Sequence, residues 1–327
     1  MARANPVLVE VTRGEMVESR HRGAVAIVKS DGQTAFAVGD TERLVYPRSA
    51  IKPLQAVYLL ESGAADAFEL TEVEIALACA SHNGEAGHVD AVRSWLTRLG
   101  FREQALECGT HAPRRKEDNA WLVKHDLVPG PVHNNCSGKH CGHLAVSKYK
   151  DLPIENYNQN NHPIQKELIN LIENLSNFKI KNIGIDGCTL PNPLIPLKKF
   201  ALAAAKIVDY KSLNEASDIA KRIFDSCVKF PEITGGSKSV NCALTKLSKG
   251  KAFFKNGAEG VFVAIIPEQK SALAVKITDG AARAAEVAIA GLISELKIID
   301  EDQIEKFKKR PVKNSTEQVI GYMNCLI

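Results

Sequence analysis

Segments with an alternating apolar pattern lie near both ends of the chain, and helical patterns fill the length between them. Residues 7–12 and 23–38 alternate, and the second segment carries a Ser-Asp-Gly turn, which predicts a β-hairpin. Residues 258–277 hold two apolar runs around Pro-Glu-Gln-Lys and predict another hairpin. Strands from both chain ends that meet in one layer give an antiparallel sheet. The predicted fold class is therefore α+β, an antiparallel sheet with flanking helices.

Apolar residues at helical spacing predict a series of helices between these hairpins. The clearest covers residues 49–62, where apolar side chains share one face and Gly63 supplies a stop signal. The polar stretch 151–162 is predicted to be an exposed connection. Further helices are predicted at 71–81, 87–99, 162–176, 198–208, 213–229, 279–295 and 301–309, with a short strand at 180–185.

Charge and cysteine content exclude several classes of protein. The 42 basic and 38 acidic side chains give a formal charge of +4, which leaves no dense basic patch for nucleic acid. The longest apolar runs are too short to span a membrane, and the N-terminus lacks a signal pattern, so we expect a cytoplasmic protein without membrane partners. Eight cysteines at irregular spacing in 327 residues do not form a disulfide scaffold, so we expect reduced and mostly buried thiols.

Composition changes abruptly near residue 150. Residues 1–150 hold 11 Arg, 7 Lys and 3 Ile, whereas residues 151–327 hold 3 Arg, 21 Lys and 22 Ile. The change indicates either a domain boundary or, as a hypothesis, a gene joined from two parents. Candidate site residues that lie on both sides of the change would favour a single catalytic unit.

The segment Ser49-Ala-Ile-Lys52-Pro53 places a hydroxyl and an amine three residues apart. On a helix these positions share one face, with about 5 to 6 Å between Cβ atoms. Pro53 predicts that the helix begins near Ser49, because proline is tolerated only in a first turn, where free N–H groups carry positive potential. That field and partial burial favour a neutral Lys52 that can take a proton from Ser49. The alternative is an N-cap serine beside a solvated lysine.

A second candidate nucleophile follows the apolar stretch EIALACA. Ser81, His82, Asn83 and Gly84 come at the end of this predicted helix, where polar groups often face a cleft. Ser81 is therefore a candidate nucleophile or substrate ligand. The alternative is a plain helix C-terminus with Gly84 as its cap.

The densest group of potential metal ligands is HNNCSGKHCGH, from His133 to His143. It holds five cysteines and histidines in eleven residues, and a distant thiol, Cys188, follows an Asp-Gly pair. Zinc prefers such sulfur and nitrogen donors. The spacing lacks the paired CxxC of a zinc finger, so a metal site here needs a distant ligand such as Cys188. A Gly-Lys anion-binding loop and packed cysteines are the alternatives.

Two glycine-containing segments come before apolar runs. Gly235 and Gly236 precede Ser-Lys, and Lys255 opens the segment KNGAEG. Tight glycine turns allow backbone N–H groups to approach a ligand. Lys255 is a candidate buried base, with a surface lysine in a turn as the alternative. Neither segment matches a P-loop or a dinucleotide-binding fingerprint.

Taken in order, six segments resemble the motifs of the rhizobial-type, or thermolabile, L-asparaginase family. They are RSAIKPLQ, CASHNGE, CGTHAP, HNNCSGKHCGH, IDGCTLPNP and KNGAEGVF, and the resemblance runs from about residue 7 to the C-terminus. It implies a fold similar to serine β-lactamases and penicillin-binding proteins, in which Ser-x-x-Lys is a catalytic motif. It also implies hydrolysis of L-asparagine to aspartate and ammonia, and a homodimer.

The resemblance implies roles for single residues. It gives two Ser-Lys pairs, Ser49 with Lys52 and Ser81 with Lys255. One zinc ion per chain would support substrate binding without supplying the nucleophile, and a lysine ligand must be neutral. The metal ligands implied are Cys136, Lys139 and Cys188. The residues expected to bind substrate are Arg48, His82, Asn83, Gly235 and Gly236.

Two departures from the family pattern leave questions open. Cys141 and His143 stand where the family usually has other residues, so an altered or additional ligand is one option. Gly235-Gly236-Ser-Lys-Ser-Val-Asn241 replaces an expected Gly-Gly-x-x-Arg segment, which puts substrate contacts from this loop in question.

The mechanism expected is a double displacement. Ser49, deprotonated by neutral Lys52, attacks the side-chain amide carbon, and water hydrolyses the acyl-enzyme, with Ser81 and Lys255 relaying protons or positioning the attack. N–H groups at the helix start hold the oxyanion, and which serine is acylated stays open. Since these residues flank position 150, we expect one catalytic unit over 1–327, with two subdomains as an option. The alternatives are a glutaminase or other serine acyl hydrolase, and a non-catalytic zinc- or amino-acid-binding protein.

Overall fold

The structure is a computed structural model that describes residues 4–210 and 218–327, and the chain divides into two compact units. The first unit consists of Met1–Ala50, Ile195–Val208 and Leu244–Ile327. The second consists of Ile51–Leu194 and Asp209–Ala243. Residue 150 lies inside the second unit, so the change in composition does not coincide with a boundary between the units.

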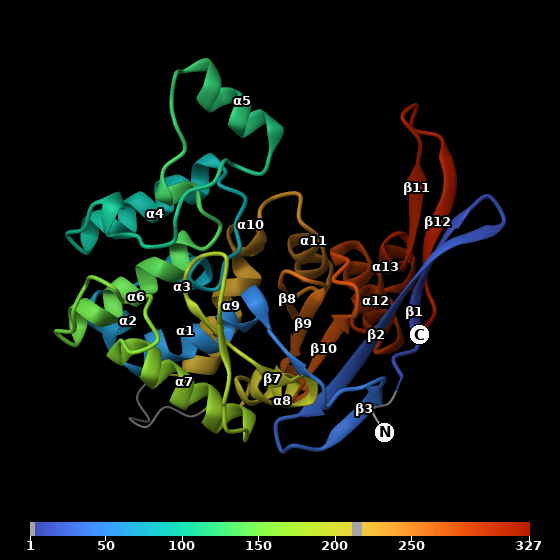
Figure 1. Cartoon of the computed structure of the whole chain (residues 1–327), viewed down its shortest axis with the longest axis horizontal. Coiled ribbons are helices and arrows are strands. Elements are labelled where there is room, and N and C mark those ends of the chain that lie inside the picture. The colour runs from blue at the N-terminus through green and yellow to red at the C-terminus, as the bar shows by residue number, and fades with distance from the viewer. Residues whose placement is uncertain (1–3, 211–217) are drawn as a thin grey trace. The chain divides into compact units, whose positions relative to one another are not determined.

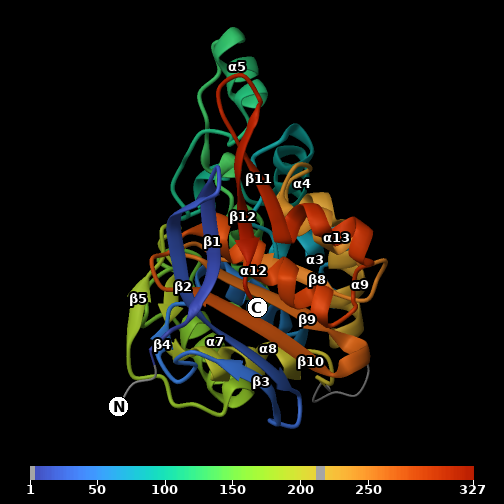
Figure 2. The same ribbon diagram turned by 90° about the vertical axis from the view of Figure 1, so that its right-hand side faces the viewer.

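An antiparallel sheet dominates the first unit. Its strand order is β11-β12-β1-β2-β10-β9-β8, with β3 paired to β2, and every neighbouring pair is antiparallel. Figure 2 shows β1, β2, β10, β9 and β8 side by side. The strands are β1 (Val7–Arg13), β2 (Met16–Lys29), β3 (Thr34–Val38), β8 (Phe253–Asn256), β9 (Val261–Ile266), β10 (Ser271–Ile277), β11 (Lys309–Lys313) and β12 (Val319–Cys325). This arrangement confirms the predicted class, with strands from both ends of the chain in one sheet.

The centre of this sheet is buried on both faces. All residues of β9 are buried, and in β10 only Lys276 is partly exposed. Such continuous apolar strands need cover on both sides. Helices α8 (Leu197–Lys206) and α12 (Ala282–Glu295) both pack against β9 and β10. The remaining elements of this unit are α13 (Glu301–Lys308), the 3-10 turn η4 (Pro267–Gln269) and a small pair formed by β4 (Leu44–Val45) and β7 (Ile195–Pro196).

The second unit is mainly helical. Helix α6 (Ser137–Tyr149) is central: it packs against α1, α2, α3, α4 and α7, and eleven of its thirteen residues are buried. Figure 1 shows α5 standing apart from the other helices of this unit. The other helices of this unit are α1 (Lys52–Glu61), α2 (Ala64–Ala67), α3 (Glu72–Ala78), α4 (Ala86–Arg98), α5 (Lys116–Lys124), α7 (Pro163–Ser176), α9 (Ile219–Lys229) and α10 (Pro231–Gly235). Its shorter elements are η2 (Glu103–Ala105), η3 (Pro131–His133) and the hairpin of β5 (Ile183–Ile185) and β6 (Pro191–Pro193).

A glycine allows α3 to approach α6 closely. A Cβ atom at Gly138 would lie 2.4 Å from the carbonyl oxygen of Leu77, so no larger residue fits there without a shift of the backbone. This contact brings the end of α3, which precedes Ser81, against the beginning of α6, which follows Cys136.

Most of the predicted helices are present, with three differences. The helix expected from Ser49 begins as α1 at Lys52, after the 3-10 turn η1 (Arg48–Ile51), and Pro53 lies in its first turn as predicted. Helices α5, α6 and α11 (Val240–Leu247) and the short helices α2 and α10 were not predicted. The beginning of the helix predicted at 213–229 lies outside the described residues, and α9 covers its remainder.

The polar connection at 151–162 is only partly exposed. Tyr157 is fully buried, and its hydroxyl lies 2.6 Å from Nδ1 of His140 on α6. None of the described helices is both long and apolar enough to cross a membrane.

Candidate functional site

Two of the predicted catalytic residues meet inside the second unit. Lys52 is the first residue of α1, and its side chain is fully buried. Its Nζ lies 3.0 Å from Oγ of Ser81 and also contacts the carbonyl oxygens of Ala80 and Asn135. The sequence spacing predicts Ser49 as the partner of Lys52, and the structure adds this contact with Ser81. Burial excludes the alternative of a solvated Lys52.

Burial also changes the protonation of Lys52. Removal from water lowers the pKa of the Lys52 ammonium, and the positive charge of Lys139 lowers it further, against the opposing effect of the Cys136 and Cys188 sulfurs. A lysine whose pKa is lowered is more often a neutral amine and so a better base. The site thus holds a hydroxyl beside an amine whose environment favours proton acceptance.

The three predicted metal ligands also lie together. Lys139 on α6 places its Nζ 3.2 Å from Sγ of Cys188, and Cys136 is the N-cap residue of the same helix. A hydrogen bond from Cys136 holds the pKa of the Cys188 thiol well below its usual value, and the Lys139 ammonium acts in the same direction. The same hydrogen bond, with burial, raises the pKa of Cys136 to about 12. The cluster is therefore a thiolate–ammonium pair with a neighbouring thiol.

This donor set fits zinc in part on its own chemistry. Two sulfurs and a nitrogen are donors that zinc prefers. Burial opposes the charged form of Lys139, yet the sulfurs of Cys188 and Cys136 hold its pKa above the usual value, so this amine must lose a proton to ligate. In the described ranges 4–210 and 218–327, no group of three or more His, Cys, Asp or Glu side chains converges as a metal site. Any site here therefore depends on Lys139.

The two residues that depart from the family pattern lie elsewhere on α6. Burial raises the pKa of the Cys141 thiol well above its usual value, so this thiol stays protonated. His143 is buried with its Nδ1 3.0 Å from the carbonyl oxygen of Lys139. All eight cysteines of the chain lie in the described ranges, none of them forms a disulfide, and seven are buried.

Both ring nitrogens of His82 form hydrogen bonds. Its Nε2 lies 2.8 Å from Oγ of Ser137, which itself donates to the carbonyl of Val132, so this nitrogen donates to Ser137. Its Nδ1 accepts a hydrogen bond from the N–H of Gly84 at 3.1 Å. Burial lowers the pKa of His82 well below its usual value, so the ring is neutral. These bonds fix the segment that carries Ser81 and Asn83.

Asn83 packs against the predicted glycine loop. Gly236 follows α10 with φ +92°, and a Cβ atom there would lie 2.1 Å from Nδ2 of Asn83. Only glycine tolerates both this backbone conformation and this contact. The N–H of Ser81 donates to the carbonyl of Thr234 at 2.8 Å. Asn83 and Gly236, both predicted to bind substrate, are therefore in contact in one loop pair.

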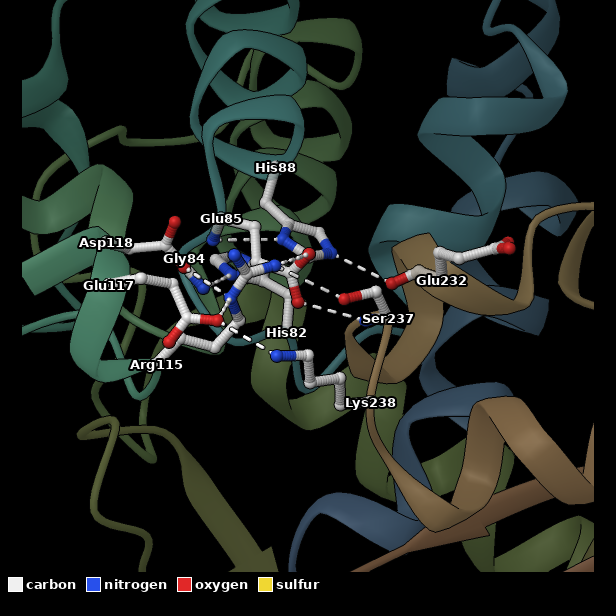
Figure 3. Close-up of polar contacts among 10 residues, drawn as sticks. All are labelled: His82, Gly84, Glu85, His88, Arg115, Glu117, Asp118, Glu232, Ser237 and Lys238. Atoms are coloured by element: carbon white, nitrogen blue, oxygen red, sulfur yellow. Dashed lines mark hydrogen bonds and ion pairs between the residues drawn. The ribbon is translucent and has the colours of Figure 1, made fainter.

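Glu85 and Arg115 hold this loop pair together and were not among the predicted site residues. Oε1 of Glu85 accepts a hydrogen bond from the N–H of Ser237 at 2.9 Å, and Oε2 accepts one from Nη1 of Arg115 at 3.1 Å (Figure 3). Burial acts against the charged form, but the hydrogen bonds from Ser237 hold the pKa of Glu85 below its usual value. His88 Nε2 donates to the carbonyl of Glu232 at 2.9 Å. The sequence does offer a signal for Glu85, because this residue ends the CASHNGE segment and directly precedes α4.

Arg48, Ser49 and Lys255 belong to the first unit. Lys255 on β8 is fully buried, which excludes the surface alternative, and its Nζ donates to the carbonyl of Asn256 at 2.8 Å. Arg48 has φ 53°, an uncommon backbone conformation beside a candidate nucleophile. A Cβ atom at Gly257 would lie 2.5 Å from the carbonyl oxygen of Pro47. The glycine thus brings the segment after Lys255 against the turn that contains Ser49.

Comparison with known proteins identifies the family. A family model described as L-asparaginase II matches residues 9–325, and the chain belongs to that family. A search of curated proteins gave no match. The family supports an amidohydrolase of the asparaginase type and confirms the resemblance read from the six motifs.

Solved structures with a similar arrangement share little sequence with this chain. Mglu in its native form is 14% identical over 86% of this chain, with a TM-score of 0.45, and Mglu in its glutamate form is 12% identical over 86%, with a TM-score of 0.47. This chain covers 66% and 62% of those Mglu chains. A β-lactamase, Mb2281c from Mycobacterium bovis, is 14% identical, with 84% of this chain and 94% of that chain covered and a TM-score of 0.42. At these scores the neighbours carry no argument about substrate or mechanism.

Proposed function

We propose that this protein is an L-asparagine amidohydrolase that uses a lysine-activated serine. The observation that carries the proposal is the buried amine of Lys52, 3.0 Å from the hydroxyl of Ser81, in a chain of the L-asparaginase II family. The substrate would be the side-chain amide of asparagine. The products would be aspartate and ammonia.

The surroundings of Lys52 suit it to accept a proton. The carbonyl oxygens of Ala80 and Asn135 only accept hydrogen bonds, so they take two N–H groups of the amine. In neutral Lys52 the lone pair then remains for the hydroxyl of Ser81. Lys52 thus has an orientation, and a lowered pKa, that favour the removal of a serine proton.

The proposed reaction is a double displacement. A serine oxygen attacks the amide carbon while its proton passes to Lys52, and this proton leaves with ammonia as the C–N bond breaks. Water then cleaves the acyl-serine ester and restores the hydroxyl. The family resemblance assigns the attack to Ser49, with Ser81 and Lys255 relaying protons or positioning water. The contact between Lys52 and Ser81 supports an essential place for Ser81 in this sequence of steps.

Substrate recognition in this proposal uses charge and the glycine loop. Arg48 would pair with the α-carboxylate of asparagine in a bidentate geometry. Asn83, Gly235 and Gly236 would line the place of the substrate amide, and His82 would act by holding Asn83 in position. The close contact of Gly236 with Asn83 supports this part of the proposal.

Cys136, Lys139 and Cys188 are proposed to hold one zinc ion. When bound, the ion would supply a fixed positive charge that supports substrate binding. Cys188 is already poised as a thiolate, whereas Cys136 and Lys139 must each lose a proton. Elemental analysis of the purified protein, and of Cys136→Ser, tests the assignment. Absence of zinc from the unaltered protein would remove this part of the proposal.

Ammonia release from a panel of substrates tests the function. Asparagine, glutamine and a chromogenic β-lactam are assayed in parallel, and asparagine should give the highest kcat/KM. A preference for glutamine or the β-lactam would reassign the protein to another serine acyl hydrolase. Binding of asparagine without turnover would make it a binding protein. The proposed homodimer and cytoplasmic location are separate, and light scattering on the purified protein tests the first.

A further inference from the structure

A small cavity lies in the second unit among α1, α6 and α7. Its volume is about 10 Å³, taken as the room open to the centre of a water molecule. Gln55 of α1 and His143 and Lys139 of α6 contribute polar side chains, and the other lining residues are mainly apolar. Every lining residue is buried. The cavity is therefore an internal feature of this unit and holds at most one small molecule.

Two buried polar atoms on residues that line this cavity have no hydrogen-bond partner in the part of the chain that the structure describes. They are Oε1 of Gln55 and Nε2 of His143, whose side chains belong to residues only 7% and 4% exposed. An acceptor buried without a partner loses its hydrogen bonds to water and gains none in return, which destabilises the folded state. Two such atoms around one cavity indicate that something in the cavity satisfies them.

Both of these atoms are hydrogen-bond acceptors. Nδ1 of His143 lies 3.0 Å from the carbonyl oxygen of Lys139, and a carbonyl only accepts, so Nδ1 carries the ring proton and donates. In a ring with a single proton, Nε2 then presents a lone pair. Oε1 of Gln55 is also an acceptor. The occupant must therefore donate two hydrogen bonds.

We propose that this cavity binds one water molecule, which donates one hydrogen to Oε1 of Gln55 and the other to Nε2 of His143. A water needs about 10 to 15 Å³ of such room and two or more polar partners, and this cavity supplies both. A metal cation does not fit, because two neutral acceptors among apolar side chains do not offset the cost of burying a charge, and the ammonium of Lys139 in the same lining repels a cation. A dry cavity does not fit either, since dry cavities in proteins are apolar.

The position of this water gives it a structural role. Gln55 lies three residues after Lys52 on α1, and His143 lies four residues after Lys139 on α6. One helical turn therefore separates each water ligand from a buried lysine. The water would connect the two helices that carry these lysines and help to set their separation. This inference does not depend on the proposed function.

A crystal structure of the full chain tests the site, with Gln55→Met as the probe variant. Methionine has a similar shape but no acceptor oxygen, so this variant should lose the water. Gln165→Met is the matched control, because Gln165 is also a buried amide, donates to the carbonyl of Tyr157 at 2.7 Å and does not line the cavity. Density for one water within hydrogen-bond distance of both acceptors is expected in the unaltered protein and in Gln165→Met.

Two results on the unaltered protein would overturn the proposal. One is an empty cavity in a structure that shows ordered waters elsewhere. The other is an amide of Gln55 turned so that it donates directly to Nε2 of His143. Both results are observed on the unaltered protein. The test is therefore decisive even if Gln55→Met does not fold. Magnetisation transfer from a long-lived water to the His143 ring protons in solution gives a second readout, and its absence would contradict the site.

Discussion

The interiors of the two units are built from different kinds of side chain. In the first unit, β9 and β10 are almost wholly buried and apolar, and few polar side chains are enclosed. In the second, α6 alone buries Lys139, His140 and His143, and Lys52 is buried at the start of α1. Eight of the nine histidines lie in the second unit, and His21 is the exception. Apolar burial stabilises the sheet of the first unit. The interior of the helical unit also contains ionisable side chains, which can take part in catalysis or ligand binding.

Removal of the buried amine should have the largest effect. Lys52→Met keeps the volume but removes the base, so kcat/KM for asparagine should fall by about 10³-fold or more, equivalent to about 4 kcal/mol. Lys276→Met is the matched control in the first unit, because burial also lowers the pKa of this half-buried lysine. Ammonia release at saturating and low substrate, with circular dichroism of each variant, makes the comparison. If Lys52→Met kept the activity of the unaltered protein, as Lys276→Met should, Lys52 would have no part in the mechanism.

A substitution that creates a cavity beside the sheet of the first unit should lower stability and leave catalysis unchanged. Leu273 on β10 is fully buried, so Leu273→Ala should lower the free energy of unfolding by about 2 to 5 kcal/mol. Val17→Ala on β2, where the side chain is 38% exposed, should change it by less than about 0.5 kcal/mol. Urea unfolding measures both. The comparison between units fails if Leu273→Ala instead lowers kcat per folded molecule as strongly as Lys52→Met.

The contrast between the units also explains what could be predicted from sequence. The strands were predictable because β2, β9 and β10 carry simple apolar patterns beside recognisable turns. Helix α6 was not predicted, because its sequence, SGKHCGHLAVSKY, is buried nearly all round and so shows no apolar stripe. Its buried Lys139, His140 and His143 read as polar in sequence. Only tertiary packing, such as the approach of Leu77 to Gly138, makes a helix of them.

The sequence named candidate residues for the site, but it did not reveal which of them are in contact. The motifs named Lys52 and Ser81, and spacing along a helix suggested Ser49 as the partner of Lys52. The contact of Lys52 with Ser81 joins positions 29 residues apart, which no local spacing reveals. The hydrogen bonds of Glu85 with Ser237 and Arg115 likewise connect three separate segments.

Acid should destabilise the second unit before the first. His82 and His88 are buried and their pKa values are lowered from the usual 6.5, so the unfolded chain binds more protons than the folded one below about pH 6.5. Their contribution to stability is complete above that pH and is lost as the pH falls, by up to about 1.4 kcal/mol per histidine per pH unit. Hydrogen exchange of each unit between pH 7.5 and about 5 measures this. Earlier loss of protection in β9 and β10 would contradict the comparison.

Alanine substitutions at two glycines with positive φ should distinguish the effect of backbone strain on stability from the effect of a contact in the site on KM. Gly236 and Gly250 both have positive φ, so backbone strain alone should cost about 1 to 2 kcal/mol of stability when either is replaced by alanine. A Cβ atom at Gly250 meets nothing within 4 Å, whereas one at Gly236 would overlap Asn83. Only Gly236→Ala should therefore also raise KM for asparagine. Unchanged KM in Gly236→Ala would remove this loop from substrate binding.

The smallest effect is expected at Glu85. Glu85→Gln keeps an acceptor for the N–H of Ser237 but loses the charge opposite Arg115, so KM should rise a few-fold, equivalent to about 1 kcal/mol. Glu117→Gln is the control, because Glu117 also pairs with Arg115 but is exposed. Steady-state kinetics of both variants with asparagine distinguishes them. Identical kinetics would mean that Glu85 does not position the loop.

Trapping of the covalent intermediate tests the central claim most directly. The protein is mixed with asparagine, quenched in acid during turnover, and digested for mass spectrometry. We predict an aspartyl ester on the peptide that contains Ser49 or Ser81, and its loss in Lys52→Met. Turnover of asparagine without any acylated serine, persisting in both Ser49→Ala and Ser81→Ala, would contradict a lysine-activated serine mechanism.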